Sequence, residues 1–231
     1  MLVALSLVTL AAIVGLVYLL CYGGLEGPVD WLMHTDPHGA RDRRRIALTF
    51  DDGPHPVHTA PLLDALAELD APATFFVVGR DVDANPALVA RIARDGHELG
   101  NHTYRHRYLP LARSRSVEHE LRATDRAIQR VTGVVPRIAR PPWGGRSPRN
   151  VRVFQRLHKR LVLWDVNSFD WKGKPVDHVV ERVLERARPG SIILMHEARD
   201  GGETTIEAVR RLVPALRARG YQFVTVSNAL C

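Results

Sequence analysis

Two adjacent carboxylates, Asp51 and Asp52, stand where a short apolar run ends in a turn. Residues 46–48 before them are typical of a buried strand, and the Gly-Pro pair at residues 53–54 would end it. Because strand side chains alternate between two faces, both carboxylates share a pocket only if the backbone turns between them. Two anions so close repel unless a metal, an arginine or a shared proton offsets the charge. The alternative is a turn whose Asp side chains cap backbone N–H groups.

A second candidate group consists of His102 and His106, which are four residues apart. On a helical turn this spacing would bring both imidazoles to one face, where they could share a metal ion. With one carboxylate of the acidic pair they would form a two-histidine, one-carboxylate ligand set that leaves positions open for water and substrate. Metal-assisted hydrolysis requires such open positions, because the divalent metal lowers the pKa of bound water to about 7 and polarises a carbonyl.

Three further clusters could complete the site. Arg140 begins a rigid Pro-Pro turn in which it could steady a carboxylate, while backbone N–H groups could face a reacting oxygen. His196 follows the apolar run at residues 192–195 and could act as a general acid, and an Asp partner would favour its protonated form. Residues 167–171 form the third cluster. Taken singly, these clusters also have structural explanations, such as a turn with Trp143 packed in the core.

The elements that must position these residues alternate between strands and helices from residue 45 onward. The expected strands are residues 46–50, 73–78, 97–101, 137–140, 161–166, 191–195 and 221–226. The expected helices are residues 58–69, 85–96, 116–133, 149–160, 176–187 and 204–219. About seven strands that alternate with helices predict a parallel α/β sheet, because parallel connections need a crossover.

The pattern of elements fits both an open doubly wound sheet and a distorted (β/α) barrel. The candidate residues that fall at the C-terminal ends of predicted strands are Asp51, Asp52, His102, Arg140, Asp170 and His196. In a barrel these ends meet around one mouth, whereas an open sheet spreads them along an edge. The positions therefore favour a barrel, formed by residues 45–231.

The N-terminal segment has a different composition. Residues 2–20 are almost entirely apolar, and the first charged residue is Glu26. Because a span of this length can cross a bilayer, we expect residues 1–22 to form one transmembrane anchor or an uncleaved signal, followed by a linker at residues 23–44. A cleaved signal peptide fits less well, because no Lys or Arg precedes the apolar run and residues 18–22 are bulky.

The charge of the chain limits its partners. The 231 residues carry a net charge of +7, mostly as arginine. These arginines are scattered across helical segments, mixed with Glu and Asp, and aromatic residues do not interleave with them. We therefore expect no nucleic-acid partner. A basic surface suits an anionic lipid or a cell-wall polymer equally well.

Taken together, the five clusters resemble the five motifs of the NodB-type polysaccharide deacetylases, also called carbohydrate esterase family four. The matching stretches are residues 49–54, 102–106, 140–144, 167–171 and 194–196. They occur in the family's order over about residues 45–226. The resemblance implies a distorted (β/α) barrel that uses a divalent metal to remove N-acetyl groups from amino sugars. The metal would be zinc, with cobalt and nickel as alternatives.

Carried over position by position, the resemblance implies a metal site formed by Asp52, His102 and His106. Asp51 would be the general base that takes a proton from metal-bound water as this water attacks the amide carbonyl. His196 would be the acid that protonates the departing amine.

The remaining motif residues would support these groups. Arg140 would orient Asp51, and Asp170 would keep His196 protonated. The backbone N–H of Trp143 would help to stabilise the oxyanion. Trp171 and Leu194 would form the small apolar pocket for the acetyl methyl group.

Two positions depart from the family's pattern. Trp143 stands where Tyr is usual, and Asn167 stands where Asp is usual. Because the role of residue 143 is a backbone N–H, we expect it to survive the change. Asp170 and Trp171 remain, so we expect catalysis to persist with a different substrate rim.

The resemblance implies an N-acetylated glycan as substrate, such as peptidoglycan, a chitin-like oligomer or poly-glucosamine. A deacylase of a lipid-linked amino sugar, a glycan-binding module without activity and a metal-dependent phosphoesterase are the rival hypotheses. No metal ligand, base or acid is missing from the motifs, which favours an enzyme. We expect a single-pass protein of the cell membrane with an extracytoplasmic catalytic domain, although the arginine run at residues 41–45 favours the opposite orientation.

Overall fold

The computed structural model describes residue 15, residues 35–197 and residues 201–231. Its strands are β1 (Thr35–Asp36), β2 (Arg45–Asp51), β3 (Thr74–Val77), β4 (Glu98–Asn101), β5 (Ile138–Ala139), β6 (Arg160–Val162), β7 (Val166–Asn167), β8 (Ile192–His196) and β9 (Gln222–Phe223). Its helices are α3 (Thr59–Glu68), α4 (Gly79–Ala84), α5 (Pro86–Arg94), α6 (Ser114–Thr132), α7 (Pro148–Arg156), α8 (Val176–Arg186), α9 (Gly202–Ala218) and α10 (Val226–Ala229). The short 3-10 turns are η1 (Pro142–Gly144) and η2 (Asp170–Lys172).

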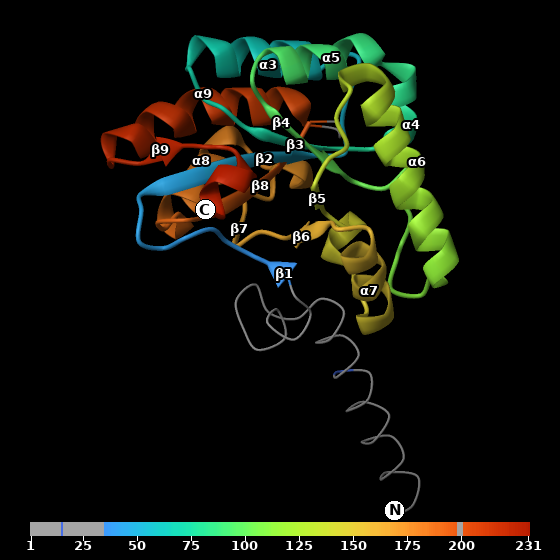
Figure 1. Cartoon of the computed structure of the whole chain (residues 1–231). Helices are drawn as coiled ribbons and strands as arrows, with labels where there is room; N and C mark the ends of the chain where they lie inside the picture. Colours follow the sequence, from blue (N-terminus) through green and yellow to red (C-terminus); the bar gives the residue numbers. More distant parts are fainter. Residues whose placement is uncertain (1–14, 16–34, 198–200) are drawn as a thin grey trace, which may run out of the picture.

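The strands form one parallel sheet with helices on its outer side (Figure 1). Their order is β1-β6-β5-β4-β3-β2-β8-β7, and β9 pairs with the start of β2. The strands β1 and β7 lie at the two ends of this path, so the sheet is a curled half-barrel. The prediction of a parallel, distorted (β/α) barrel is confirmed in this coarser form.

The number of strands was predicted incorrectly. The described residues form nine strands rather than about seven, because residues 161–166 divide between β6 and β7, and β1 falls within the expected linker at residues 23–44. The helix α4 was not expected either. Strands of two residues are too short to leave a periodic pattern in the sequence, which explains why β1 and β7 were missed.

The anchor expected at residues 1–22 lies outside the described residues, apart from residue 15, and so does the linker up to residue 34. No helix among the described residues is long and apolar enough to span a bilayer. The first described element is β1, which pairs with β6.

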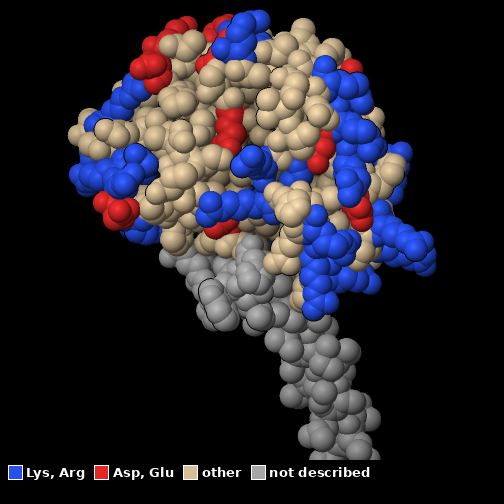
Figure 2. Space-filling model, viewed as in Figure 1, with Lys and Arg blue, Asp and Glu red and all other residues tan. Residues whose placement is uncertain are grey.

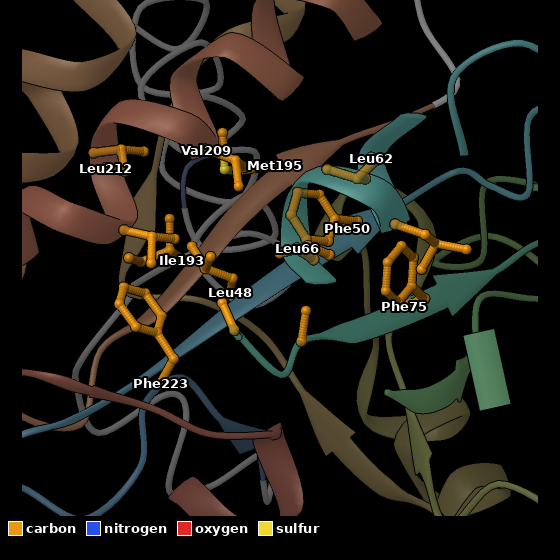
Figure 3. Packing of buried hydrophobic residues seen from close by; sticks show 14 of the residues in the cluster. Leu48, Phe50, Leu62, Leu66, Phe75, Ile193, Met195, Val209, Leu212 and Phe223 are labelled. Atoms are coloured by element: carbon orange, nitrogen blue, oxygen red, sulfur yellow. The ribbon is translucent and has the colours of Figure 1, made fainter. Parts of the chain in front are cut away.

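The alternation of side chains along β2 divides the core from the site. Ile46, Leu48 and Phe50 face the helices and belong to the largest buried hydrophobic cluster. Figure 3 shows Leu48 and Phe50 of β2 packed with side chains of α3, β3, β8 and α9. Thr49 and Asp51 point to the opposite face, toward the inside of the curled sheet. The same alternation of side chains that places apolar residues in the core therefore directs Asp51 toward the inside of the curled sheet.

The surface is unevenly charged. In the view of Figure 1, Lys and Arg side chains gather along the edge of the molecule where α6 and α7 lie (Figure 2). The buried face of α6 packs against α7 through a second apolar cluster that includes Leu121 and Phe154. This arrangement leaves the polar sides of both helices exposed.

We predict that Leu212→Ala in α9 destabilises the protein. Leu212 is fully buried in the main cluster, so its truncation should lower the free energy of unfolding by about 2–5 kcal/mol. Urea denaturation measures the change. The matched control is Leu111→Ala, whose side chain is 82% exposed and should change stability by less than about 0.5 kcal/mol. Equal losses in both variants would contradict the assigned core.

Candidate active site

A pocket of about 210 Å³ opens at the C-terminal ends of the strands. Every site residue predicted from the sequence lines it except Arg140 and Asp170, which are buried behind its wall. Trp164 and Asn167 also line it and were not among the predicted site residues. The structure therefore brings all five sequence clusters to one place.

The two adjacent carboxylates reach this pocket because the backbone turns between them. Asp51 is the last residue of β2 and lies opposite His196 of β8 in the parallel register. Asp52 has a φ of 73°, in the left-handed region, so the chain turns directly after the strand. As a result, both side chains approach His102: its Nε2 is 3.8 Å from Asp51 Oδ2 and 3.3 Å from Asp52 Oδ1.

The candidate metal site consists of Asp52, His102 and His106, each of which offers one ligand atom within 4.8 Å of the others. The Nε2 atom of His106 is 2.9 Å from Asp52 Oδ1. The two histidines do not lie on a helical turn, so that expectation was wrong. They belong to the loop of residues 102–113 between β4 and α6, here called the histidine loop, in which Thr103 and His106 have φ values of 66° and 51°. The loop, rather than helical periodicity, brings the rings together.

The donor set fits a divalent metal. His102 Nδ1 lies 2.7 Å from the carbonyl oxygen of Arg140, which only accepts hydrogen bonds. Nδ1 therefore carries the proton, and in the neutral ring the lone pair of Nε2 faces the carboxylate of Asp52. Two facing lone pairs repel, whereas a cation between them attracts both. A ring oriented by a carbonyl in this way is typical of metal-binding histidines.

The charge of Asp52 is also consistent with a ligand role. Burial raises the pKa of Asp52, but when His102 and His106 are protonated and no metal is bound, their hydrogen bonds and charges outweigh burial and hold this pKa well below its usual range. Asp52 is therefore an anion, which is the form that binds a metal.

The histidine loop is held by Glu120, a buried residue of α6. Glu120 Oε2 accepts hydrogen bonds from the backbone N–H groups of Tyr104, at 3.0 Å, and Arg105, at 2.7 Å. These two residues lie between the histidines. Because a carboxylate binds N–H groups more strongly than a neutral acceptor does, Glu120 fixes the unusual backbone of the loop. Sequence reasoning missed this residue, since it resembles any helical glutamate.

Arg140 fixes the position of Asp51. Its guanidinium is fully buried and donates from Nη1 to Asp51 Oδ1 at 2.7 Å and to Thr49 Oγ1 at 2.8 Å. It also donates from Nη2 to the carbonyl of Leu163 at 2.7 Å. Asp51 Oδ1 is thereby engaged, and Oδ2 is left on the side that faces His102.

His196 is paired with Asp170. Its Nδ1 lies 3.0 Å from Asp170 Oδ1, and its backbone N–H donates to Asp170 Oδ2 at 2.6 Å. Thr205 also donates to Asp170 Oδ2. Burial lowers the pKa of His196, but the hydrogen bond and charge of Asp170 outweigh burial, so this pKa is raised. With Nδ1 engaged, Nε2 is the nitrogen of His196 that can exchange a proton in the pocket.

The two tryptophans form the rim of the pocket. Trp143 has a φ of 56° and a side chain that is 50% exposed, so it is not packed in the core. Its ring lies against that of His106, with centroids 4.5 Å apart. Trp171 is 40% exposed and lines the pocket together with Leu194.

Glu197 is a second residue that sequence reasoning missed. It is fully buried, and burial raises its pKa to about 8. Thr59 donates to its Oε2 at 2.5 Å. A Cβ at Gly53 would lie 1.6 Å from its Oε1, so only glycine allows this close approach beside Asp52. A charged residue directly after a strand gives no signal of burial in the sequence.

Comparisons with known proteins agree with this geometry. The model of the polysaccharide deacetylase family matches residues 38–162. A peptidoglycan-N-acetylglucosamine deacetylase of Bacillus cereus is 34% identical over 191 residues, which cover 82% of this chain and 70% of the relative. A chitooligosaccharide deacetylase of Azorhizobium caulinodans is 34% identical over 193 residues, which cover 78% of this chain and 92% of the relative.

Solved structures share the fold. The crystal structure of the Bc1960 peptidoglycan N-acetylglucosamine deacetylase matches with a TM-score of 0.85 at 31% identity, covering 88% of this chain and 97% of that chain. A protein of Bacillus anthracis described as a CE4 family pseudoenzyme matches with a TM-score of 0.80 at 27% identity, covering 84% of this chain and 68% of that chain. Because a pseudoenzyme has this fold, the residues of the pocket must carry the argument for activity.

We predict that Glu120→Gln weakens metal binding. The amide keeps the size of the side chain but loses the charge that holds the backbone of the histidine loop, so the dissociation constant for zinc should rise about tenfold. Competition with a chromophoric chelator measures it. The matched control is Glu118→Gln, which changes a partly exposed carboxylate two residues earlier in α6 and should leave the constant unchanged. An unchanged constant in Glu120→Gln, in a folded protein, would contradict the role of Glu120.

Proposed function

Because the chain belongs to the polysaccharide deacetylase family, whose named relatives are hydrolytic deacetylases, we propose that it removes N-acetyl groups from amino sugars of a cell-wall or surface polysaccharide in a metal-dependent reaction. The observation that carries this proposal is the convergence of Asp52, His102 and His106 beside Asp51 and His196 in one pocket. The proposed substrate is peptidoglycan or a chitin-like oligomer, as the names of its relatives suggest.

Asp52, His102 and His106 would hold the metal, with zinc the first candidate. Two imidazoles and one carboxylate suit zinc, and the same ligands accept cobalt or nickel. When bound, the metal would polarise the amide carbonyl and acidify a water molecule.

Asp51 is the proposed base. A carboxylate that removes a proton from the attacking water must be near it and must keep a fixed orientation. Arg140 supplies the orientation through its hydrogen bond to Oδ1, so that Oδ2 can take the proton. The hydrogen bond from Arg140 to Thr49 prevents the guanidinium from following a displaced carboxylate.

His196 is the proposed acid. The amine that leaves an amide needs a proton, since an amide anion is a very poor leaving group. Asp170 holds Nδ1 of His196, and Thr205 in turn holds Asp170, so the ring can present Nε2 to the nitrogen of the substrate.

The rest of the pocket would bind the acetyl group. Trp143 lines the pocket and has a left-handed backbone, and we propose that its backbone N–H donates to the oxyanion. Trp171 and Leu194 give the pocket an apolar wall that fits a methyl group. Asn167 lines the same pocket and would contact the sugar in place of the usual Asp. We also propose that the reaction takes place outside the cytoplasm, at the cell membrane; the apolar run of residues 2–20 and the cell-wall substrates in the names of the relatives support this proposal.

The test is acetate release by the full chain in detergent, from N-acetylglucosamine oligomers and from peptidoglycan. Chelation should abolish release, and added zinc should restore it. His102→Ala should lose both metal and activity. Asp51→Asn should keep the metal and lose about 10²- to 10⁴-fold in kcat, which is the usual contribution of a general base.

The possible failures point to different alternatives. Full activity of Asp51→Asn would remove Asp51 from the base role. If the metal-loaded protein released no acetate, a lipid-linked amino sugar would become the preferred substrate. If the folded protein bound no metal, the hypothesis of a glycan-binding module would replace that of an enzyme.

A second prediction concerns pH. Asp170 raises the pKa of His196, so the protonated acid persists to higher pH. Asp170→Asn removes this charge, and the alkaline limb of kcat against pH should move to lower pH. The control is Asp177→Asn, which removes an exposed carboxylate of α8 and should leave the limb in place. An unmoved limb in an active Asp170→Asn variant would show that His196 is not the acid.

A further inference from the structure

Positive charge is concentrated in one part of the chain. Residues 105–156 contain thirteen arginines and only three carboxylates, Glu118, Glu120 and Asp125. Eleven of these arginines are exposed, since only Arg140 and Arg146 are buried. This segment comprises the second half of the histidine loop, α6, the Trp143 turn and α7. Figure 2 shows the resulting band of basic side chains.

The spacing of the arginines places them on one side of each helix. The set is Arg115, Arg122 and Arg126 in α6, with Arg149, Arg152 and Arg156 in α7, here called the α6–α7 basic face. Intervals of seven and four residues, or of three and four, return to the same side of a helix. Glu118 joins the two stripes, because it contacts Arg122 at 2.9 Å and Arg156 at 3.5 Å. The two rows of guanidinium groups are therefore neighbours.

The carboxylates of this segment do not neutralise the face. Glu120 is buried beneath the histidine loop, and Asp125 binds Lys159 at 2.7 Å. Among the described residues, Arg115, Arg126 and Arg152 have no carboxylate within 4.0 Å. The third carboxylate, that of Glu118, is shared between two arginines, Arg122 and Arg156. The sequence suggested that basic and acidic residues are mixed here, but two of the three acids point inward.

The basic face begins at the rim of the pocket. The helix α6 follows the histidine loop, in which Arg105 and Arg107 are exposed on either side of His106. The helix α7 follows the turn of Trp143, and the rings of Trp143 and Tyr108 lie 6.3 Å apart. Both helices thus lead from the aromatic rim down the side of the barrel. A chain held at the rim would have its substituents against this face.

We propose that the α6–α7 basic face binds carboxylate groups on the side branches of an anionic glycan while one of its amino sugars occupies the pocket. This inference rests on the proposed function and specifies its substrate as a glycan that bears acidic branches. Guanidinium groups bind carboxylates through two parallel hydrogen bonds, and a neutral N-acetylglucosamine polymer has no carboxylate to accept them. Continuity with the pocket favours the substrate itself over a membrane as the partner.

The test compares two soluble substrates with the full chain in detergent. One is a peptidoglycan fragment that carries peptide carboxylates, and the other is a neutral N-acetylglucosamine oligomer of the same length. The variant Arg126→Gln/Arg152→Gln/Arg156→Gln changes residues that the mechanism does not use. The control is Arg43→Gln/Arg94→Gln/Arg186→Gln, which removes the same charge from exposed residues elsewhere.

The face variant should raise KM for the anionic fragment about tenfold, because three exposed ion pairs are lost together. The value of kcat, and KM for the neutral oligomer, should not change. Added salt should remove the difference in KM for the anionic fragment between the wild type and the face variant. The inference is overturned if KM for the anionic fragment is unchanged, if KM rises equally for both substrates, or if the control variant has the same effect.

Direct titration separates this inference from the proposed function. If neither glycan releases acetate, the proposed function fails. The face is still supported if the wild type binds the anionic fragment in a salt-sensitive way and the face variant does not. The last measurement is the binding of the wild type and the face variant to vesicles with and without phosphatidylglycerol. Loss of phosphatidylglycerol-dependent binding in the face variant, with unchanged binding of the glycan fragment, would assign the face to a membrane and overturn the inference.

Discussion

The site depends on one buried arginine. Arg140 is fully buried inside the curled sheet, where a guanidinium is costly unless hydrogen bonds and a counter-charge compensate for lost water. Asp51, Thr49 and the carbonyl of Leu163 provide that compensation, and the ring of Phe76 lies 4.1 Å from the guanidinium carbon. The carbonyl of the same arginine orients His102. One residue, directly after β5, thus sets the geometry of both the proposed base and a proposed metal ligand.

The acidic and basic groups of the molecule have separate places. In the pocket Asp51 is buried and Asp52 is partly buried, and each lies beside specific partners, Arg140 for Asp51 and the two histidines for Asp52. Most of the arginines of α6 and α7 are exposed. Low solvent access strengthens interactions inside the pocket, whereas salt screens those outside. The interior is therefore suited to orienting single groups, and the exterior to attracting a charged polymer.

The fold alone does not decide whether a protein of this family is active, since a pseudoenzyme of Bacillus anthracis shares it with a TM-score of 0.80. The positions at the strand ends decide instead. In this chain they include a candidate metal-ligand set, the proposed base and a histidine–aspartate pair, supported by residues behind the pocket wall such as Glu120 and Thr205. These supporting contacts are the part of the site that a motif does not describe.

The sequence by itself determined which residues stand at the mouth of the barrel. Apolar runs fix the strands, and a parallel sheet places all their C-terminal ends on one side, so Asp51, His102 and His196 could be placed together without coordinates. Only the tertiary structure decided how the histidine loop folds, that Glu120 holds it, and that two of the three acids of α6 turn inward. Those features depend on contacts between residues that are distant in the sequence, and such contacts leave no periodic signal in the chain.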